Sequence, residues 1–489
     1  MSDKNYDSNP RWYVVHTYSG YENKVKTDLE KTIKNRELEN YFFDICDELG
    51  LVVFFDLAFA CTLYYPDEKM LANIKTEVRQ NLERLRHHPS IAVICGNNEV
   101  EHCNAKRIGT PVADRCIPAN IELFEEVIAD IAKEVCPEIP YIHTSPITIG
   151  RFVDPRNENF GDTHYWDVWH QNKPFAEYRN HHFRYLSEFG FQSFPSEKTI
   201  QAITLPEDRN IFSRVMEKHQ RNAGANGKII NYLSQTYLYP NDFGTLIYAS
   251  QLLQAEAMRY GVEHLRRERG RCMGTLYWQL NDIWPTASWS SIDYYGRLKA
   301  LHYYAKRFYS KIALGLFNEG DTITINVASE SMDSFEGYIK YGVRKNDLSL
   351  VYESEKHFTI SPLSSLDVEC VPNFEFNTHR DAYFYAELYD KNDKLIAKST
   401  ELGTEPKHFK LLKPTIDTKI EMVDGGALIT LSSDVLAKDV EISFKNHDIV
   451  VSDNYFDLAT DMPYTVFAKT TLTKSELEQE ISLFSVYDI

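Results

Sequence analysis

Two glutamates, Glu99 and Glu188, each follow a short apolar run that is typical of a buried strand. Glu99 closes the segment SIAVICGNNE, and Glu188 lies within FRYLSEFGFQS. In a barrel of parallel strands, the side chains at the carboxyl ends of the strands converge on one mouth, where the active site lies. Two carboxyls at one mouth can cleave a glycoside, because one protonates the leaving oxygen and the other attacks the anomeric carbon or activates water. Either glutamate alone is more typical of a structural ion pair, so the hypothesis depends on the two together.

A third segment, GTLYWQLNDIWP at residues 274–285, offers aromatic and polar side chains together. Trp278 at a strand end could stack on a sugar ring, and the polar residues after it could bind hydroxyl groups. The alternative is a buried tryptophan that packs the rim of a barrel. The 31 tyrosines, 27 phenylalanines and 6 tryptophans favour carbohydrate only slightly, because aromatic residues also fill protein cores.

His164, Asp167 and His170 are candidate metal ligands because they share the short segment GDTHYWDVWH. If this segment is an extended strand, His164 and His170 face one side and Asp167 faces the other. The eight cysteines show no zinc spacing, which is typical of reduced, partly buried thiols. No nucleotide-binding loop and no G-x-S-x-G motif is present. We therefore predict neither a metal nor an organic cofactor.

Length and charge limit the kinds of partner. The chain has 489 residues, which suggests about three domains, and its 53 basic and 71 acidic side chains give a net charge of −18. A protein this acidic repels phosphate, so we predict no nucleic-acid partner and no membrane partner. No window approaches the ~20 apolar residues of a membrane span, and MSDKNYDSNP shows no export signal, so we predict a cytoplasmic protein. The sequence does not predict an oligomeric state.

Up to about Ser310, apolar runs alternate with amphipathic helical stretches, which predicts an α/β fold of parallel strands covered by helices. We expect strands at 51–55 and 91–95 and further strands that end at Thr144, Val168, Glu188 and Trp278. We expect helices at 70–85, 121–135 and 246–267. After Ile312 the hydrophobic period becomes two, in two sets of segments on either side of a linker at 406–414. This pattern predicts two antiparallel β-sandwiches.

Several segments together resemble the catalytic half of glycoside hydrolase family 2 β-mannosidases. The resemblance covers about residues 41–489. It is specific because many motifs occur in the order that the family shows. The matching stretches are Phe43–Gly50, Leu85–Ile91, Gly96–Glu99, Ser187–Ser193, Tyr277–Asp282, Ser290–Gly296 and Lys299–Tyr303.

The resemblance implies a retaining exo-β-mannosidase that removes terminal β-D-mannose from oligosaccharides. Glu99 matches the acid/base at the end of the fourth barrel strand, and Glu188 matches the nucleophile at the end of the seventh. Asn98 would hold the 2-hydroxyl of the sugar, and Trp278 would line the sugar subsite. In such a pair the carboxyls are about 5–5.5 Å apart, and we expect the acid to have a raised proton affinity. Related enzymes cleave β-galactosides, β-glucuronides or glucosaminides, and spacing alone does not choose among these sugars.

Two further residues, Trp166 and Asp56, are candidates for sugar binding. Around Asp56 the family usually reads Trp-Gln-Asp-Phe, whereas this chain has Phe-Phe-Asp-Leu at residues 54–57. Family members also carry two β-domains and the first two barrel strands before the region that matches. This chain has about 40 residues in that place, so the resemblance implies an incomplete TIM (β/α)8-type barrel, followed by two immunoglobulin-like β-sandwich domains.

The first 40 residues resemble something else. Residues 10–26, PRWYVVHTYSGYENKVK, are similar to the opening of the transcription factor NusG, and the similarity ends near Glu39. We interpret this as a join of two gene fragments, either natural or an error of sequence assembly. We predict that Trp12–Thr17 forms a strand beside 51–56 as a substitute second barrel strand. The barrel would then be one strand short, with an exposed edge that lowers stability.

The expected domains are therefore a NusG-like strand-helix fragment at 1–40, a partial catalytic barrel at 41–311, and sandwiches at 312–406 and 407–489. Three functions remain open. The first is a β-mannosidase-type glycoside hydrolase, and the second is an inactive remnant that keeps the fold without a complete sugar pocket. The third is a NusG-related transcription factor.

Overall fold

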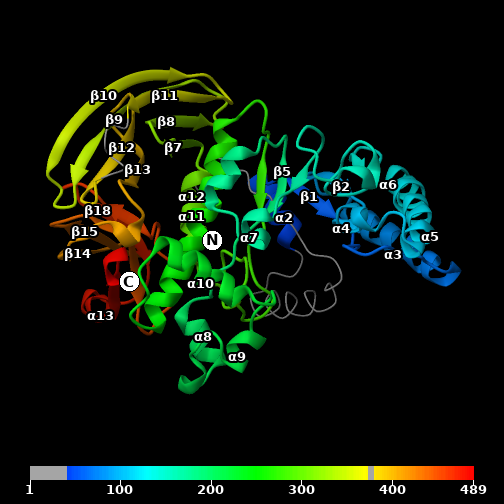
Figure 1. Ribbon diagram of the computed structural model, residues 1–489, viewed down its shortest axis with the longest axis horizontal. Helices are drawn as coiled ribbons and strands as arrows, with labels where there is room; N and C mark the ends of the chain where they lie inside the picture. Colours follow the sequence, from blue (N-terminus) through cyan, green and yellow to red (C-terminus); the bar gives the residue numbers. More distant parts are fainter. Residues whose placement is uncertain (1–40, 373–378) are drawn as a thin grey trace. The chain divides into compact units, whose positions relative to one another are not determined.

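The computed structural model describes residues 41–372 and 379–489 (Figure 1). The chain forms two compact units, each composed of several segments. In the described part, unit 1 contains residues 41–166, 181–189 and 271–283, and unit 2 contains residues 167–180, 190–270 and 284–489. The NusG-like segment lies outside the described residues, together with its predicted strand at Trp12–Thr17.

Unit 1 contains a first parallel sheet of three strands, in the order β1 (Val53–Asp56), β2 (Ile91–Cys95) and β3 (Tyr141–Ile142). The register pairs Asp56 with Cys95 and Cys95 with Ile142, so the three carboxyl ends lie side by side. A second parallel sheet has the order β4 (Thr163–His164), β5 (Leu186–Phe189) and β6 (Thr275–Tyr277). In this sheet His164 is opposite Glu188.

The helices of unit 1 pack on the first sheet because their apolar side chains recur at helical spacing. Helix α3 (Glu68–Leu85) begins at Asp67, whose side chain accepts a hydrogen bond from the Met70 amide, and it buries Ile74, Val78, Leu82 and Leu85. These side chains share one core with strands β1 and β2. The remaining elements are α2 (Tyr41–Leu49), α4 (Val100–Asn104), η1 (Ala105–Arg107), α5 (Pro111–Ile121), the π-helical turn η2 (Glu122–Val127), α6 (Ile128–Val135) and η3 (Arg151–Val153).

Unit 2 contains helices and all the antiparallel strands. Its long helix α11 (Phe243–Arg267) is buried along most of its length, and its start is capped by Asp242. The other helices are α7 (Asp167–Gln171), η4 (Phe175–Asn180), α8 (Glu197–Ile203), η5 (Pro206–Asp208), α9 (Arg214–Lys218), α10 (Ala225–Thr236), α12 (Ala300–Phe308), η7 (Pro406–His408), α13 (Lys474–Glu480) and η8 (Val486–Asp488).

The first sandwich of unit 2 packs a three-stranded sheet against a four-stranded one (Figure 1). The three-stranded sheet has the order β11 (Ser365–Pro372), β8 (Thr322–Ser329) and β7 (Ile312–Asn318). The four-stranded sheet has the order β10 (Leu350–Ile360), β9 (Phe335–Lys345), β12 (Ala382–Asp390) and β13 (Leu395–Leu402). All these pairs are antiparallel, as the period of two predicts.

The second set of strands forms two three-stranded antiparallel sheets. One has the order β14 (Ile416–Val423), β15 (Gly426–Ser433) and β18 (Tyr464–Lys469). The other has the order β17 (Phe456–Leu458), β16 (Ala437–Phe444) and β19 (Ile481–Phe484). The predicted linker at 406–414 contains only the short helix η7. The structure therefore confirms the change from parallel to antiparallel strands after Ile312.

The strand expected to end at Val168 is wrong, because β4 ends at His164 and Asp167–Gln171 is helix α7. Asp167 lies in the first turn of this helix, where a negative charge is favourable, so the extended geometry assumed for His164, Asp167 and His170 does not exist. The six parallel strands of the described residues form two separate sheets and no closed ring of eight strands, so the incomplete barrel stays a prediction.

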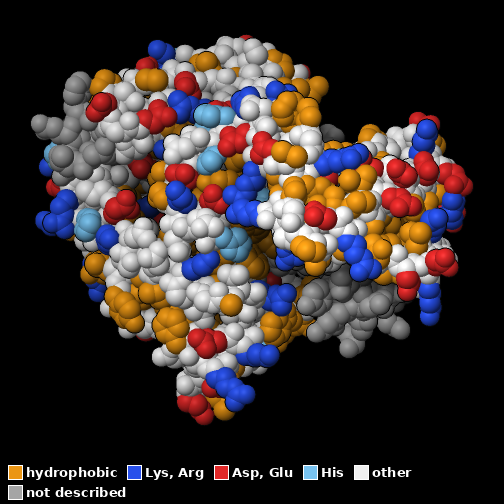
Figure 2. Space-filling view, turned by 45° about the vertical axis from the view of Figure 1, so that its right-hand side comes forward, with side chains coloured by type: hydrophobic (Ala, Val, Ile, Leu, Met, Phe, Trp, Pro, Cys, Tyr) orange, Lys and Arg blue, Asp and Glu red, His pale blue; other side chains and the backbone are white. Residues whose placement is uncertain are grey.

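None of the helices in the described ranges combines the length and the hydrophobicity that a bilayer crossing requires. On the face shown in Figure 2, acidic and basic side chains are intermixed. All eight cysteines lie in the part of the chain that the structure describes, where they are free thiols, four buried, two half-buried and two exposed.

Candidate functional site

Glu99 lies just beyond the end of β2, where the chain turns into helix α4. The turn is held between two neighbouring segments: the Asn98 amide donates to the Phe59 carbonyl at 2.9 Å, and the Glu99 amide donates to the Ser145 carbonyl at 2.6 Å. Glu99 has a φ of 61°, in the left-handed region that residues other than glycine rarely occupy. A strained residue that its surroundings hold in place is typical of a functional position.

Gly96 allows the strand ends to approach each other beneath this turn. A Cβ atom at Gly96 would lie 2.3 Å from the Tyr141 hydroxyl oxygen and 2.5 Å from the His143 carbonyl oxygen. Tyr141 itself is held by a hydrogen bond of 2.7 Å to the Phe124 carbonyl. Only glycine therefore fits at position 96 without moving the segment that follows β3.

Glu188 lies on β5 and is buried. The indole N–H of Trp166 donates a hydrogen bond of 2.9 Å to its Oε1 atom. Because His164 is opposite Glu188 in the register of β4 and β5, this second sheet brings an imidazole and an indole to one carboxylate. Trp166 was predicted to bind sugar; the structure shows its indole nitrogen bonded to Glu188, and its contact with a sugar stays a prediction.

His164 brings the two predicted glutamates together. Its Nδ1 atom lies 2.8 Å from Oε1 of Glu99 and 3.8 Å from Oε1 of Glu188. One carboxylate oxygen of Glu99, one of Glu188 and a ring nitrogen of His164 all lie within 4.8 Å of one another. The structure thus brings one carboxylate oxygen of Glu99 and one of Glu188 to the same place, and the spacing of about 5–5.5 Å that a retaining pair requires stays a prediction.

A chain of hydrogen bonds behind His164 fixes its second ring nitrogen. The Ser145 hydroxyl donates to Oδ2 of Asp162 at 2.6 Å, and the Ser187 hydroxyl donates to the same oxygen at 2.5 Å. Since Ser145 has a single proton and gives it to Asp162, it accepts from Nε2 of His164, which lies 3.1 Å away. Nδ1 of His164 and Oε1 of Glu99 therefore share one proton.

The charges place this proton on the histidine. Burial favours the neutral imidazole, but the charge of Glu188 and the hydrogen bond to Glu99 outweigh it and raise the pKa of His164 to about 9. Burial also opposes ionisation of Glu99, yet the hydrogen bond and the charge of His164 hold the pKa of Glu99 well below its usual range. The expectation of a raised proton affinity at Glu99 is therefore wrong for this structure, because it left out the imidazolium between the two carboxyls.

The other predicted sugar-binding residues lie at strand ends of unit 1. Asn98 is buried, and its side-chain oxygen has no hydrogen-bond partner in the described part of the chain, as expected of a group that binds a ligand. Trp278 directly follows β6, and its amide donates to the Phe189 carbonyl at 2.8 Å. Asp56 is buried at the end of β1. Their contacts with a sugar remain predictions.

Sequence reasoning missed several groups around Glu99. His164 was considered only as a metal ligand, although it ends a strand just as the glutamates do. The thiols of Cys61 and Cys103 lie 3.8 Å and 3.6 Å from Oε2 of Glu99. Because these cysteines are far apart in the sequence and show no paired spacing, no pattern in the chain predicts that they meet.

Comparison with known proteins gives three family matches. Residues 321–408 match the model of a mannosidase Ig/CBM-like domain, and residues 411–489 match the model of an Ig-fold domain of mannosidases. Residues 10–48 match the model of the transcription termination factor NusG, which extends into helix α2. The two mannosidase matches coincide with the two sets of antiparallel strands in unit 2.

Among curated proteins, the chain is similar to β-mannosidases. It is 33% identical to β-mannosidase B of Thermothelomyces thermophilus over 298 residues, which cover 57% of this chain and 34% of that protein. It is 29% identical to the β-mannosidase of Bos taurus over 492 residues, which cover 92% of this chain and 55% of that protein. The chain thus spans between about a third and just over half of the length of these relatives.

Solved structures agree with this similarity. The β-D-mannosidase of Dictyoglomus thermophilum superposes with a TM-score of 0.82 at 29% identity, covering 91% of this chain and 54% of that chain. The exo-chitosanase CsxA of Amycolatopsis orientalis superposes with a TM-score of 0.71 at 16% identity, covering 98% of this chain and 63% of that chain, and shows likeness of fold alone.

Proposed function

We propose that this chain is a retaining exo-β-mannosidase-type glycoside hydrolase, with Glu99 as acid/base and Glu188 as nucleophile. The observation that carries the proposal is that one atom each of Glu99, His164 and Glu188, which come from the two parallel sheets of unit 1, lie within 4.8 Å of one another. The similarity to β-mannosidases over most of the chain supports terminal β-D-mannose of an oligosaccharide as the substrate.

In the first step, an oxygen of Glu188 attacks the anomeric carbon and forms a glycosyl ester. The bond to the leaving oxygen breaks, and Glu99 delivers a proton to that oxygen. The hydrogen bond of 2.9 Å from Trp166 orients the attacking carboxylate. This geometry limits the freedom of the nucleophile before the reaction, which lowers the entropic part of the barrier.

In the second step, Glu99 accepts a proton from water, and the water oxygen attacks the anomeric carbon. The ester to Glu188 breaks, and mannose leaves with its original anomeric configuration. One proton must therefore leave and re-enter the acid/base position in each cycle. His164 supplies that proton. Its Nδ1 atom lies 2.8 Å from Oε1 of Glu99 and can pass the proton to Glu99 as the leaving oxygen gains charge.

The domain organisation that goes with this function is also a proposal. Residues 41–311 would form the partial (β/α)8 barrel of the catalytic part, and residues 312–406 and 407–489 the two immunoglobulin-like sandwiches. The two mannosidase family matches support the sandwich domains. The six parallel strands of the described residues support the barrel, and β1, β2 and β5 carry Asp56, Glu99 and Glu188 at or near their carboxyl ends.

Hydrolysis of 4-nitrophenyl β-D-mannopyranoside by the full chain tests the function. We expect turnover, with β-mannose as the first product in a proton NMR time course. Glu188→Gln should reduce kcat by about 1,000-fold or more, because the covalent step loses its nucleophile. Glu68→Gln removes an exposed carboxylate from helix α3 and serves as the matched control with unchanged turnover.

The same experiment separates the alternatives. An inverted first product would overturn the retaining mechanism, and unchanged turnover in Glu188→Gln would remove Glu188 from the chemistry. Binding of mannose without turnover would identify an inactive sugar-binding protein. The matching β-galactoside, β-glucuronide and β-glucosaminide test the choice of sugar, and faster cleavage of one of them would replace mannose in the proposal.

A further inference from the structure

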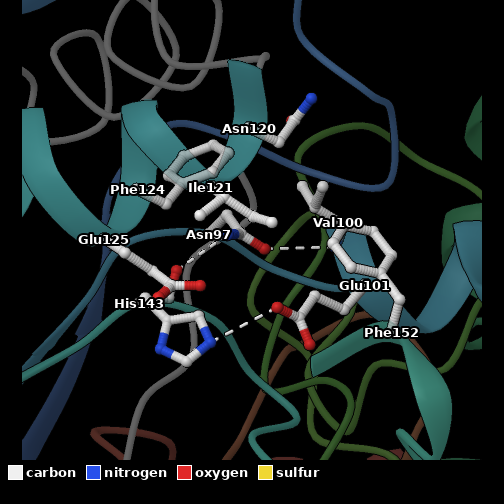
Figure 3. Close-up of a pocket in the computed structure, with 9 residues that line it drawn as sticks. All are labelled: Asn97, Val100, Glu101, Asn120, Ile121, Phe124, Glu125, His143 and Phe152. Carbon is white, nitrogen blue, oxygen red and sulfur yellow. Dashed lines mark hydrogen bonds and ion pairs between the residues drawn. The ribbon is translucent and has the colours of Figure 1, made fainter. Parts of the chain in front are cut away.

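A second group of chemically active side chains lies in unit 1, behind the turn that carries Glu99. Glu101 on helix α4, Glu125 on the turn η2 and His143 just after β3 each contribute one atom to a cluster in which all the atoms lie within 4.8 Å of one another. These residues line a small pocket together with Asn97, Val100, Asn120, Ile121, Phe124 and Phe152. Figure 3 shows the carboxyl of Glu101 and the ring of His143 pointing toward one another, with Glu125 beside the ring.

Glu101 is a buried carboxyl group, and the surrounding protein bonds only one of its two oxygens. Its side chain is only 5% exposed, and its Oε1 atom lies 3.3 Å from Nε2 of His143. Its other oxygen, Oε2, is buried and has no hydrogen-bond partner among the described residues. A buried carboxylate with an unpartnered oxygen is unfavourable unless something binds it, which points to a ligand in this pocket.

Glu125 adds a second carboxylate, and Arg151 bonds to only one of its two oxygens. Arg151 donates to its Oε2 atom at 2.7 Å from an exposed position, whereas its Oε1 atom is buried and has no partner in the ranges that the structure describes. One arginine thus faces two carboxyl groups in this cluster. The two unpartnered oxygens and one imidazole nitrogen form a set of oxygen and nitrogen atoms of the kind that binds cations.

The backbone around the cluster is held in place by Asn97. The amide nitrogen of Asn97 donates to the His143 carbonyl at 2.8 Å, and its oxygen accepts from the Val100 amide at 3.1 Å (Figure 3). One side chain thus ties the segment that bears His143 to the start of the helix that bears Glu101. A site whose ligands stand on such fixed elements is prepared for an ion in advance.

We propose that Glu101, Glu125 and His143 bind a divalent cation of the Mn²⁺ class. Carboxylates suit Mg²⁺, Ca²⁺ and Mn²⁺, and an imidazole favours a transition ion, so Mn²⁺ satisfies both kinds of ligand. Octahedral bonds of about 2.1 Å place adjacent ligand atoms about 3 Å apart and opposite ones about 4.2 Å apart. The 3.3 Å between Oε1 of Glu101 and Nε2 of His143 fits an adjacent pair, and the ligand atom of Glu125 lies within 4.8 Å of both residues' ligand atoms.

The ion would join helix α4, the turn η2 and the end of β3 at one point. Because Val100, the first residue of α4, directly follows Glu99, the ion would also stiffen the turn that carries Glu99. This site is separate from the pair of Glu99 and Glu188, so the proposal does not depend on the proposed hydrolase activity.

Direct binding of Mn²⁺ to the full chain tests the site. The protein is freed of metals with EDTA and desalted, and Mn²⁺ is added while the EPR signal of free aqueous Mn²⁺ is followed. We expect one equivalent to be bound. Glu101→Gln should weaken binding by about tenfold or more, because the buried charge is lost. Glu122→Gln removes an exposed carboxylate from the same turn η2 and should bind as the unchanged chain does.

A second measurement identifies the nitrogen ligand of the ion in the unchanged chain. Pulsed EPR of the bound Mn²⁺ should show coupling to an imidazole nitrogen, and His143→Gln should abolish this coupling. If the variants do not fold, the coupling in the unchanged chain still decides the question. Absence of Mn²⁺ binding, binding without the nitrogen coupling, or unchanged affinity in a folded Glu101→Gln would overturn the proposal and leave an ion pair between His143 and Glu101.

Discussion

The ring of His164 and the carboxylate of Glu99 share one proton across 2.8 Å, although 65 residues separate them in the chain. The proton lies on the histidine because Glu188 is also close to the ring, 3.8 Å away. The two carboxyls are thus held near each other by a positive charge between them, which offsets the repulsion that two buried carboxylates would otherwise show.

Replacing His164 should change how the stability of the protein depends on pH. Burial opposes the charged imidazole, but the charge of Glu188 and the bond to Glu99 raise the pKa of His164 to about 9. The stability that the charged imidazole contributes is therefore complete below about pH 6.5 and disappears as the pH rises through 9. The pKa of Glu99 is lowered, so its contribution is present above about pH 4.5 and disappears in stronger acid. Stability lost in His164→Gln should therefore be greatest between about pH 4.5 and 6.5, on the order of 2 kcal/mol.

Thermal melting of the unchanged chain and of His164→Gln from pH 4 to pH 10 measures this difference. The control is His357→Gln, which removes an exposed histidine with its own glutamate partner at 2.9 Å and should give a small difference at every pH. An equal loss at pH 6 and pH 10 in His164→Gln would show that the imidazole is neutral in the folded protein.

The indole of Trp166 should matter through its N–H group rather than its ring. Trp166→Phe keeps an aromatic ring but removes the donor that lies 2.9 Å from Oε1 of Glu188. A hydrogen bond to a charged group contributes about 1.5–3 kcal/mol, so kcat/KM for the chromogenic mannoside should fall by about 10- to 100-fold. Tyr65→Phe, which changes an exposed ring, should leave the kinetics unchanged. A rise in KM with constant kcat would instead indicate that Trp166 acts only in sugar binding.

Gly96→Ala should destabilise the protein. The added methyl group would lie 2.5 Å from the His143 carbonyl oxygen, which belongs to backbone and cannot move independently. Overpacking of this kind costs about 1–3 kcal/mol, so the melting temperature should fall by several degrees. Gly227→Ala in helix α10 meets no atom within 4 Å and should be neutral or stabilising. Equal melting temperatures for Gly96→Ala and the unchanged chain would mean that the end of β3 shifts without cost.

Cys103 should react slowly with iodoacetamide although it is exposed. The hydrogen bond with Cys61, burial of the sulfur and the charge of Glu99 all raise the pKa of the Cys103 thiol, which leaves little reactive thiolate at neutral pH. Cys61→Ala removes the first of these causes and should accelerate alkylation of Cys103 by about tenfold or more. Peptide mass spectrometry follows the reaction, and the exposed Cys370 provides an internal control whose rate should not change. The same rate at Cys103 in both proteins would rule out the link between the two thiols.

The sequence alone predicts the parts of this structure that depend on local pattern. The period of two after Ile312 predicts the two sets of antiparallel strands found there, because alternate side chains face the core of a sandwich. The spacing of Ile74, Val78, Leu82 and Leu85 predicts helix α3. The rule that side chains meet at the carboxyl ends of parallel strands is sufficient to bring Glu99 and Glu188 together.

The rest depends on contacts that no local pattern contains. His164 meets Glu99 because β2 and β4 carry them to the same place, and Ser145 and Asp162 complete the chain of hydrogen bonds from two further segments. The predicted rise in the proton affinity of Glu99 was wrong because the prediction did not include His164. The strand expected at Val168 was wrong because an apolar residue between two tryptophans fits a short helix as well as a strand.

The division of unit 1 into three stretches of chain has a consequence for biosynthesis. Glu99, Glu188 and Trp278 belong to three different stretches, and residues 190–270, which belong to unit 2, are translated between the last two. Strand β6 leaves the ribosome last of the six, so β5 lacks one neighbour until residue 277 has emerged. The surroundings of Glu188 are therefore completed late in translation, after all the strands of the first sheet, β1 to β3, have emerged.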